Sequence, residues 1–533
     1  MSVKPSEEIN TGNPSFVITV VLTNSSEKTC EINYTERVLV NFVLNSTQYI
    51  EKSKRRLAYN SNIRIDNRKE MAIADISYTA NTFLVLPGRN ERFVYDVDPP
   101  SVFMYAKNPV GKKYASEINV NKDTLAAEIK VSVKPGETKT FDIVIGTTDG
   151  QNFNNVGKQV ADLYAGANAG YTLEGLYARQ WKNRMPDFST EKNEILRREM
   201  LWNAHMIEAS AKYSEYYKET FIPQGSVYSY HFGDNISNRD HLQAALPACY
   251  TNPKLAKSCI RYVIKHSETD GEIKRGNYYG YGYTPPSIYK ESDPQLYFFN
   301  TLSEYLLITK DYGFLNEKVA YFPAESGRKD AVITMLKKYF IYLRDEVGTG
   351  PNGLVRILNS DWSDSFFHDY SPNKYVGSAE SHLNSAMVLA IFPKLIEVLK
   401  KSGNQEAVSL VTALEDYRAL IDKVYMKDLG DRKFSARAYL SSKLKFGLDN
   451  VCIEPHGYLL QIPTLSVERK KEIYQYIKSK ILTPEKIGMR TREKPLWGGN
   501  PDGEDGGIWF SLEYPVLLGV ATFDKEEAMS LLM

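Results

Sequence analysis

The chain has 533 residues, of which 42% are hydrophobic and 25% are charged, and its formal net charge is +1. This length exceeds one ordinary domain and predicts two or three. The near-neutral charge, without a basic patch or an acidic tail, makes nucleic acid and anionic membrane surfaces poor candidate partners. We therefore expect a globular, soluble protein that binds neither.

The residues that usually mark metal sites, disulfides or export are not patterned for those roles. The four cysteines (Cys30, Cys249, Cys259 and Cys452) are scattered, which predicts reduced thiols. The seven histidines show no metal-ligand spacing, and no glycine-rich nucleotide loop is present. The polar N-terminus does not have a secretion-signal pattern, and no apolar run reaches the roughly 18 residues of a membrane helix. We therefore expect a cytoplasmic protein without a metal cofactor.

The first part of the chain is typical of antiparallel β-structure. The strand-like runs are residues 16–22, 36–44, 72–78, 82–86, 128–133 and 139–145. Pro135 and Gly136 form a turn signal between the last two runs. Many short strands with such turns predict a β-sandwich, which we assign to residues 1–148.

The periodicity then becomes helical. Residues 153–181 predict a helical linker, assigned to residues 149–187. The later helix candidates are residues 195–217, 241–250, 255–266, 294–309, 330–345, 381–400, 405–425 and 467–481. Long loops rich in glycine and aromatic residues separate them, and such loops usually carry function. This alternation predicts an α/α toroid over residues 188–533, with its site built from the loops at one end.

One loop between helices has the composition of a sugar site. Its apolar run ends in Asp361 and Asp364, with Trp362 between them. An indole face can stack on a sugar ring, and a poorly solvated carboxyl group can donate a proton to a glycosidic oxygen. The structural alternative is that these aspartates cap the next helix. The motif by itself leaves both interpretations open.

Six further polar clusters lie at loop–helix junctions. They are residues 238–243, 292–297, 378–381, 435–439, 453–457 and 503–509. A single aspartate or serine at a helix start is usually a cap. Seven such clusters on one helical domain are harder to explain by capping and favour a shared site.

In this order the clusters resemble motifs of the glycoside hydrolase family 94 phosphorylases, the group that includes cellobiose and chitobiose phosphorylases. Asn238–Gln243 is similar to the family's Phe-Arg-Asp-Gln-x-Gln, Ser292–Tyr297 to Asp-Asp-Pro-Leu-Trp, Asp361–Asp364 to Asp-Trp-Asn-Asp, Ala379–Ser381 to Gly-Glu-Ser and Glu504–Gly507 to Glu-Asn-Gly-Gly. The resemblance implies an N-terminal β-sandwich, a helical linker and an (α/α)6 barrel, followed in the family by a small β domain.

The resemblance also implies roles for individual residues. Asp364 takes the position of the general acid, and Trp362 walls the same sugar subsite. The other substrate-binding positions that it implies are Arg239, Asp240, Asp293, Asp361, Glu380, Arg437, Glu454 and Glu504. Inorganic phosphate is the implied co-substrate, with no cofactor, and a homodimer is the oligomeric state common in the family.

The family mechanism is inverting phosphorolysis. The acid protonates the glycosidic oxygen while phosphate attacks the opposite face, so a β-glycoside yields an α-sugar 1-phosphate. An inverting hydrolase is a second hypothesis, in which Glu504 or Asp505 activates water and lies roughly 6.5–9.5 Å from the acid. A non-catalytic carbohydrate-binding protein is a third. His368, close to Asp364 in sequence, is expected to be a loop histidine rather than a ligand.

The sequence departs from the family pattern at the phosphate site. Ser511 stands where the family has a phosphate-binding histidine, and Gly233 stands where some members have an arginine. These differences remove charge that would hold a phosphate dianion and leave Ser511 as the phosphate-binding candidate. The last barrel helices would be expected beyond Met533, so we expect an incomplete barrel with exposed apolar helix faces.

Overall fold

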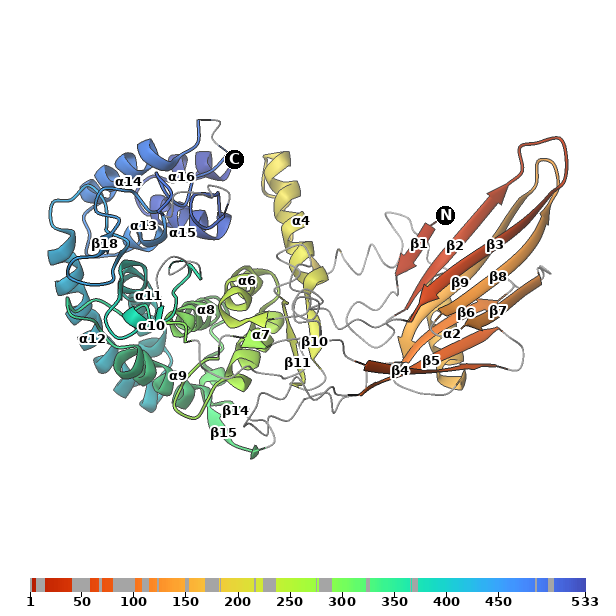
Figure 1. The fold of residues 1–533 in the computed structure, drawn as a ribbon, viewed down its shortest axis with the longest axis horizontal. Coiled ribbons are helices and arrows are strands. Elements are labelled where there is room, and N and C mark those ends of the chain that lie inside the picture. Colours follow the sequence, from red (N-terminus) through yellow and green to blue (C-terminus); the bar gives the residue numbers. More distant parts are fainter. Residues whose placement is uncertain are drawn as a thin grey trace. The chain divides into compact units, whose positions relative to one another are not determined.

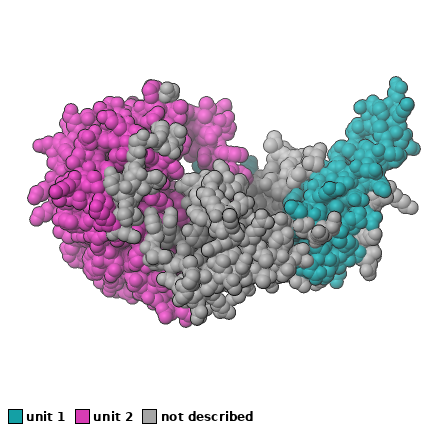
Figure 2. Space-filling model, viewed as in Figure 1, with its two compact units in different colours: residues 1–190 teal, residues 191–533 magenta. Residues whose placement is uncertain are grey.

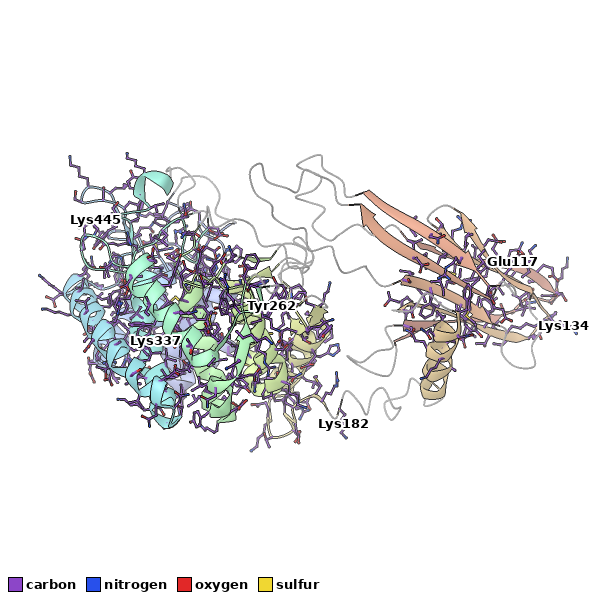
Figure 3. All side chains as sticks on the ribbon, turned by 90° about the horizontal axis from the view of Figure 1, so that it is seen from below. Glu117, Lys134, Lys182, Tyr262, Lys337 and Lys445 are labelled. Carbon is purple, nitrogen blue, oxygen red and sulfur yellow. The ribbon has the colours of Figure 1, made fainter. Side chains whose placement is uncertain are left out.

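The computed structural model divides the chain into two compact units, Met1–Thr190 and Glu191–Met533 (Figure 2). Figure 3 shows their side chains, for example Glu117 and Lys134 in the first unit and Tyr262 in the second. The described residues are 2–5, 15–40, 58–66, 70–79, 101–107, 115–121, 124–148, 153–167, 182, 184–214, 217–223, 236–274, 276–277, 290–322, 326–364, 366, 372–484, 487–496 and 503–533.

The first unit contains two antiparallel sheets (Figure 1). The larger has the order β1-β2-β9-β6-β5-β4, and the smaller has the order β3-β8-β7. Their strands are β1 (Ser2–Pro5), β2 (Ser15–Thr23), β3 (Cys30–Leu39), β4 (Ala58–Ile65), β5 (Met71–Thr79), β6 (Ser101–Lys107), β7 (Ala115–Asn121), β8 (Thr124–Val133) and β9 (Thr138–Thr148). The predicted antiparallel β region is therefore confirmed.

The alternation of side chains along each strand explains how both faces of the larger sheet are covered. Ile18 and Met104 lie on one face, in a core shared with Ile129 of the smaller sheet. Residues next to them in sequence point the other way, and Phe103 packs with Val156 of α2 (Phe153–Ala167). Because successive residues of a strand face opposite sides, an apolar run on these strands serves two cores at once.

The strand predictions differ from the structure in detail. The run predicted at residues 36–44 belongs to β3, which begins earlier, at Cys30, and residues 41–44 lie outside the described part. The run at residues 82–86 and the linker residues 168–181 lie outside it too. Strands β1, β4, β6 and β7 were not predicted. In β4 and β7, asparagine, serine and charged side chains interrupt the apolar pattern on which strand prediction depends.

The second unit is mainly helical. Its helices are α4 (Glu194–Ser210), α6 (Asn238–Thr251), α7 (Pro253–Lys265), α8 (Pro294–Thr309), α9 (Val332–Ile341), α10 (Pro372–Tyr375), α11 (His382–Lys401), α12 (Gln405–Leu429), α13 (Glu454–Leu459), α14 (Val467–Ile481), α15 (Phe510–Ala521) and α16 (Lys525–Leu532). All eight helices predicted in this region are present. The chain is thus a mixed α+β protein, and the toroidal arrangement stays a prediction.

Two helix predictions needed correction, and four helices were not predicted. The helix predicted to reach Tyr217 ends at Ser210, because residues 212–214 form β10 and pair with β11 (Glu219–Phe221). The helix predicted over residues 330–345 changes at Tyr342 into a π-helical turn. Helices α10, α13, α15 and α16 were not predicted, since α10, α13 and α16 are short and α15 contains a proline, so none offers a long amphipathic pattern.

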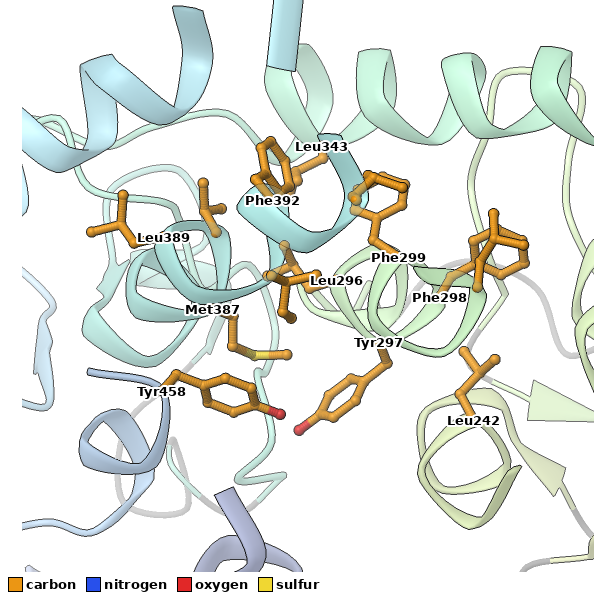
Figure 4. Packing of buried hydrophobic residues seen from close by; sticks show 14 of the residues in the cluster. Leu242, Leu296, Tyr297, Phe298, Phe299, Leu343, Met387, Leu389, Phe392 and Tyr458 are labelled. Atoms are coloured by element: carbon orange, nitrogen blue, oxygen red, sulfur yellow. The ribbon is translucent and has the colours of Figure 1, made fainter. Parts of the chain in front are cut away.

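Helices α8 and α11 form the centre of the second unit. Figure 4 shows Leu296 and Phe299 of α8 beside Met387 and Phe392 of α11. Contrary to the sequence prediction, α11 is long and apolar enough to cross a membrane by length and composition, with a mean hydropathy of 1.4 over its apolar window. Since 78% of that window is buried inside the protein, packing in the core accounts for its composition.

The close contact between α13 and α15 generates a stability prediction. A Cβ atom on Gly457 would lie 2.5 Å from Cβ of Pro515 and 2.9 Å from the backbone nitrogen of Val516. We expect Gly457→Ala to destabilise the helical unit by about 1–3 kcal/mol through overpacking, measured as a lower unfolding temperature. Gly313→Ala is the control, because its added Cβ would have its nearest neighbour at 3.6 Å. Equal stability of the two variants would contradict this packing.

Candidate active site

The centre of the site is a buried ion pair between Asp361 and Arg437. The guanidinium donates to both carboxylate oxygens, at 2.6 and 2.7 Å, and both side chains are fully buried. The hydroxyl of Ser381 donates to the same carboxylate at 2.7 Å. Burial by itself would raise the pKa of Asp361, but Arg437 and these hydrogen bonds hold it below its ordinary value. Asp361 is therefore an ionised anchor and not a proton donor.

Arg239, in the first turn of α6, connects this pair to a group of acids. Its guanidinium donates to the backbone oxygen of Asp361 at 2.6 Å and to Oδ1 of Asp364 at 2.9 Å. Longer contacts reach Asp293 at 3.4 Å and Glu291 at 3.8 Å. One guanidinium thus holds together residues that lie far apart in the sequence, as the order of the motifs predicted for Arg239, Asp293, Asp361 and Asp364.

Asp364 differs from the other acids around Arg239 in its access to solvent. Its side chain is 35% exposed, whereas the side chains of Asp293 and Glu291 are 0% and 1% exposed. Burial raises the pKa of Asp293 well above its ordinary value, and Arg239 opposes this rise. Asp293 therefore retains its proton to a higher pH than a free aspartate. Of these acids, Asp364 is the one that a ligand can reach from outside.

Two segments face each other beside Asp364. We call residues 361–364 the acid loop and residues 503–507 the glutamate turn. The hydroxyl of Ser363 donates to Oε2 of Glu504 at 2.9 Å. The rings of Trp362 and Trp509 meet edge to face, with centroids 5.4 Å apart. The acid loop therefore lies against the glutamate turn and against Trp509, which follows that turn.

A row of buried charges of alternating sign runs behind this place. We call it the ion chain: Asp361, Arg437, Glu454, Arg492 and Asp505. Glu454 accepts from Arg437 and from Arg492, each at 3.0 Å, and Arg492 donates to Asp505 at 2.7 Å. Arg437 also lies over the ring of Phe366, 4.7 Å from its centroid. Arg437 and Glu454, predicted as substrate-binding residues, are fully buried among these partners.

Several predicted site residues lie apart from these contacts. The carboxylate of Glu380 accepts from the backbone nitrogens of Asn352 and Leu354 and so holds the turn before the acid loop. Burial raises its pKa, which those hydrogen bonds oppose. Asp240 is partly buried next to Arg239, and Ser511 is exposed at the start of α15. His368 lies outside the described residues.

Sequence reasoning missed Arg492, Glu291 and Phe366 as members of the site. Arg492 lies in an Arg-Thr-Arg-Glu-Lys segment, whose composition is typical of a solvent-exposed stretch. In the structure its side chain instead pairs with Glu454 and with Asp505 of the glutamate turn. Glu291 directly precedes the recognised motif Ser292–Tyr297. Its position two residues before Asp293 was the sequence signal that could have indicated a place in the site. Within the described part of the chain, no group of three or more histidine, cysteine or acidic residues is arranged to hold a metal ion.

Comparison with known proteins places the chain among the glycoside hydrolases. The model of the Glycosyl hydrolase 94 superfamily, catalytic domain, matches residues 180–456. Since this match covers more than half of the chain, the chain belongs to glycoside hydrolase family 94, as the motifs predicted. The matched range includes the acid loop and ends before Arg492 and Glu504.

The individual relatives either match over a shorter range than the family model or have a low sequence identity to this chain. A solabiose phosphorylase from Paenibacillus borealis is 34% identical over 130 residues, which are 24% of this chain and 15% of that protein. A candidate kojibiose phosphorylase from the human microbiome is 9% identical, with a TM-score of 0.45 over 78% of this chain and 52% of its own. A bacterial glucoamylase complexed with acarbose is 12% identical, with a TM-score of 0.48 over 99% and 86%.

His456, at the base of the site, generates a pH prediction. Its Nε2 accepts from the backbone N–H of Ser435 and its Nδ1 donates to the oxygen of Cys452, so both nitrogens are used in the neutral form. Burial lowers the pKa of His456 to about 4. The unfolded chain, with a pKa of about 6.5, binds more protons, so the contribution of His456 to stability is lost as the pH falls below that value.

Between pH 7.5 and pH 5 this loss amounts to about 2 kcal/mol in the free energy of unfolding. We expect His456→Gln to show a smaller decrease over this range than the parent protein, measured by denaturant unfolding at each pH. His205→Gln in α4 is the matched control for the loss of a histidine from the same unit. An unchanged pH dependence in His456→Gln would show that this group does not titrate as its contacts predict.

Proposed function

We propose that this protein catalyses inverting phosphorolysis of a β-linked gluco-type di- or oligosaccharide, releasing an α-sugar 1-phosphate. Membership of family 94 supports the reaction class. The observation that favours Asp364 as the acid is its exposure beside the buried Arg239, because a proton donor must reach the glycosidic oxygen. Asp361, its neighbour in the motif, is fully buried and ionised, which leaves it without that access.

In the proposed reaction the proton of Asp364 passes to the glycosidic oxygen as the bond to the anomeric carbon breaks. Phosphate, as the monohydrogen dianion, forms the new bond from the opposite face, and its proton returns to Asp364. The guanidinium of Arg239, 2.9 Å from Asp364, stabilises the carboxylate that exists between these two transfers. No protein nucleophile takes part.

The residues around Asp364 can position a sugar ring. Trp509 is partly exposed and offers an apolar face, and the partly exposed Glu504 and Asp240 offer carboxylates. We assign these three residues to the sugar subsite. Trp362 and Ser363 are buried and support it, Trp362 by packing on Trp509 and Ser363 by its hydrogen bond to Glu504. Asp361, Arg437 and Glu454 are assigned to the frame behind it, since their side chains are buried and already bonded to one another.

The direct test is incubation with a panel of β-linked gluco- and N-acetylgluco-oligosaccharides, with and without phosphate, assayed for sugar 1-phosphate and free sugar. We expect sugar 1-phosphate only when phosphate is present. Asp364→Asn should lower turnover about 10²–10⁴-fold, the usual contribution of a general acid. Asp431→Asn, which changes an exposed aspartate elsewhere in the same unit, is the control. Full turnover in Asp364→Asn would exclude it as the acid.

Inverting hydrolysis is the second candidate, and the charges of the site favour it specifically. Arg239, Arg437 and Arg492 each contact carboxylates, so their charge is largely compensated before any phosphate arrives. Ser511 adds no charge. In this reaction Glu504 removes a proton from water, which attacks the anomeric carbon while Asp364 protonates the leaving oxygen. Glu504 suits the role better than Asp505, which is buried against Arg492.

Substitution of Glu504 separates the two reactions. If water is the nucleophile, Glu504→Gln should lower the release of free sugar about 10²–10⁴-fold by removing the general base. If phosphate is the nucleophile, the same change should act mainly on KM for the sugar. Steady-state kinetics of both products gives the answer. Sugar binding that survives Asp364→Asn, with no product from the parent protein in any arm, would instead indicate a carbohydrate-binding protein.

A further inference from the structure

We infer that Arg492 is a positioning residue, which fixes the glutamate turn opposite the acid loop without itself touching the substrate. This inference rests on the proposed function, in which Asp364 and the sugar subsite on the glutamate turn must face each other. Arg492 lies outside the range matched by the family model and outside every motif in the sequence. Its assignment comes from its contacts in the helical unit.

The side chain of Arg492 links Asp505, the last member of the ion chain, to Glu454 and the members before it. Its Nη2 donates to Glu454 at 3.0 Å, and Glu454 is bonded through Arg437 to Asp361 of the acid loop. Its Nη1 donates to Asp505 at 2.7 Å and to the backbone oxygen of Glu504 at 3.0 Å. One guanidinium therefore connects the anchor of the acid loop with the backbone of the residue that carries the opposing carboxylate.

The backbone holds Arg492 from both sides. The N–H of Ile453 donates to the oxygen of Thr491 at 2.8 Å, and the N–H of Glu493 donates to Val451 at 2.9 Å. On the other side, the N–H of Thr491 donates to the oxygen of Gly507 at 2.9 Å. The segment around Arg492 thus lies between the residues that precede α13 and the glutamate turn. Such pairing fixes the side chain in register with both of its carboxylate partners.

The burial of the Arg492 side chain distinguishes a positioning role from direct binding of the substrate. The side chain of Arg492 is 0% exposed, so a sugar cannot reach it without displacing its partners. The planar fork of arginine can serve two carboxylates and a carbonyl at once, which the single ammonium of lysine cannot reproduce. A loosened glutamate turn would move Glu504 relative to Asp364, and a displacement of about 1 Å in such a site can cost about 100-fold in rate.

Trp362 and Trp509 supply a readout that does not depend on catalysis. They lie on the acid loop and directly after the glutamate turn, with ring centroids 5.4 Å apart. Two indoles at this separation couple in circular dichroism, and the coupled signal is identified by its loss in Trp509→Phe. The signal reports whether the two segments still face each other, whatever the substrate is.

The experiment compares Arg492→Lys and Arg492→Gln with Arg490→Gln in the whole 533-residue chain. Arg490 is the matched control, because it lies two residues away on the same segment with an exposed side chain. We expect both Arg492 variants to lose the coupled tryptophan signal and about 100-fold in kcat/KM for the sugar. Arg490→Gln should retain both. If Arg492→Gln does not fold, Arg492→Lys and Glu454→Gln test the same link.

Three results would overturn the inference. They are a retained tryptophan signal in the Arg492 variants, an unchanged kcat/KM despite a lost signal, or equal losses in Arg490→Gln. A parent protein that forms neither sugar 1-phosphate nor free sugar would overturn the proposed function instead. The tryptophan comparison would then still decide whether Arg492 holds the two segments together.

Discussion

The arrangement of the site depends on the bidentate pair between Arg437 and Asp361. A carboxylate that is wholly removed from water is costly unless a partner compensates its charge and fills its hydrogen-bonding capacity. Arg437 does both for Asp361, and its remaining donor continues to Glu454. The pair fixes Asp361, the first residue of the acid loop, in the interior. Asp364, the last residue of that loop, can therefore remain open to solvent.

This division between a buried frame and an open acid explains how one short motif can contain two aspartates with opposite properties. Asp361 is ionised and immobile, whereas Asp364 is accessible and shares Arg239 with buried acids. The same division separates residues that shape the site from residues that can meet a ligand. The partly exposed Trp509 and the carboxylate of Glu504 belong to the second group, whereas Trp362, which packs edge to face on Trp509, is buried.

Much of the architecture could be predicted from the sequence, because helices longer than two turns impose a strong period. The order of polar motifs also predicted the family and brought Arg239, Asp293, Asp361 and Asp364 to one place. The sequence could not show that Glu380 would bond a nearby turn, or that Arg492 would be buried. Both outcomes depend on long-range contacts, which local pattern does not encode. The end of α4 was missed for the same reason, since the pairing of β10 with β11 overrides periodicity.

The position of the glutamate turn near residue 505 has a consequence for how the protein matures on the ribosome. Chains emerge from their N-terminus, and domains begin to fold as they emerge. Asp361, Arg437 and Glu454 have all been synthesised before the segment from Arg492 to Trp509. The anchor of the acid loop is therefore synthesised before the segment that carries Glu504 and Trp509, and the two sides of the site can face each other only once that segment has been made.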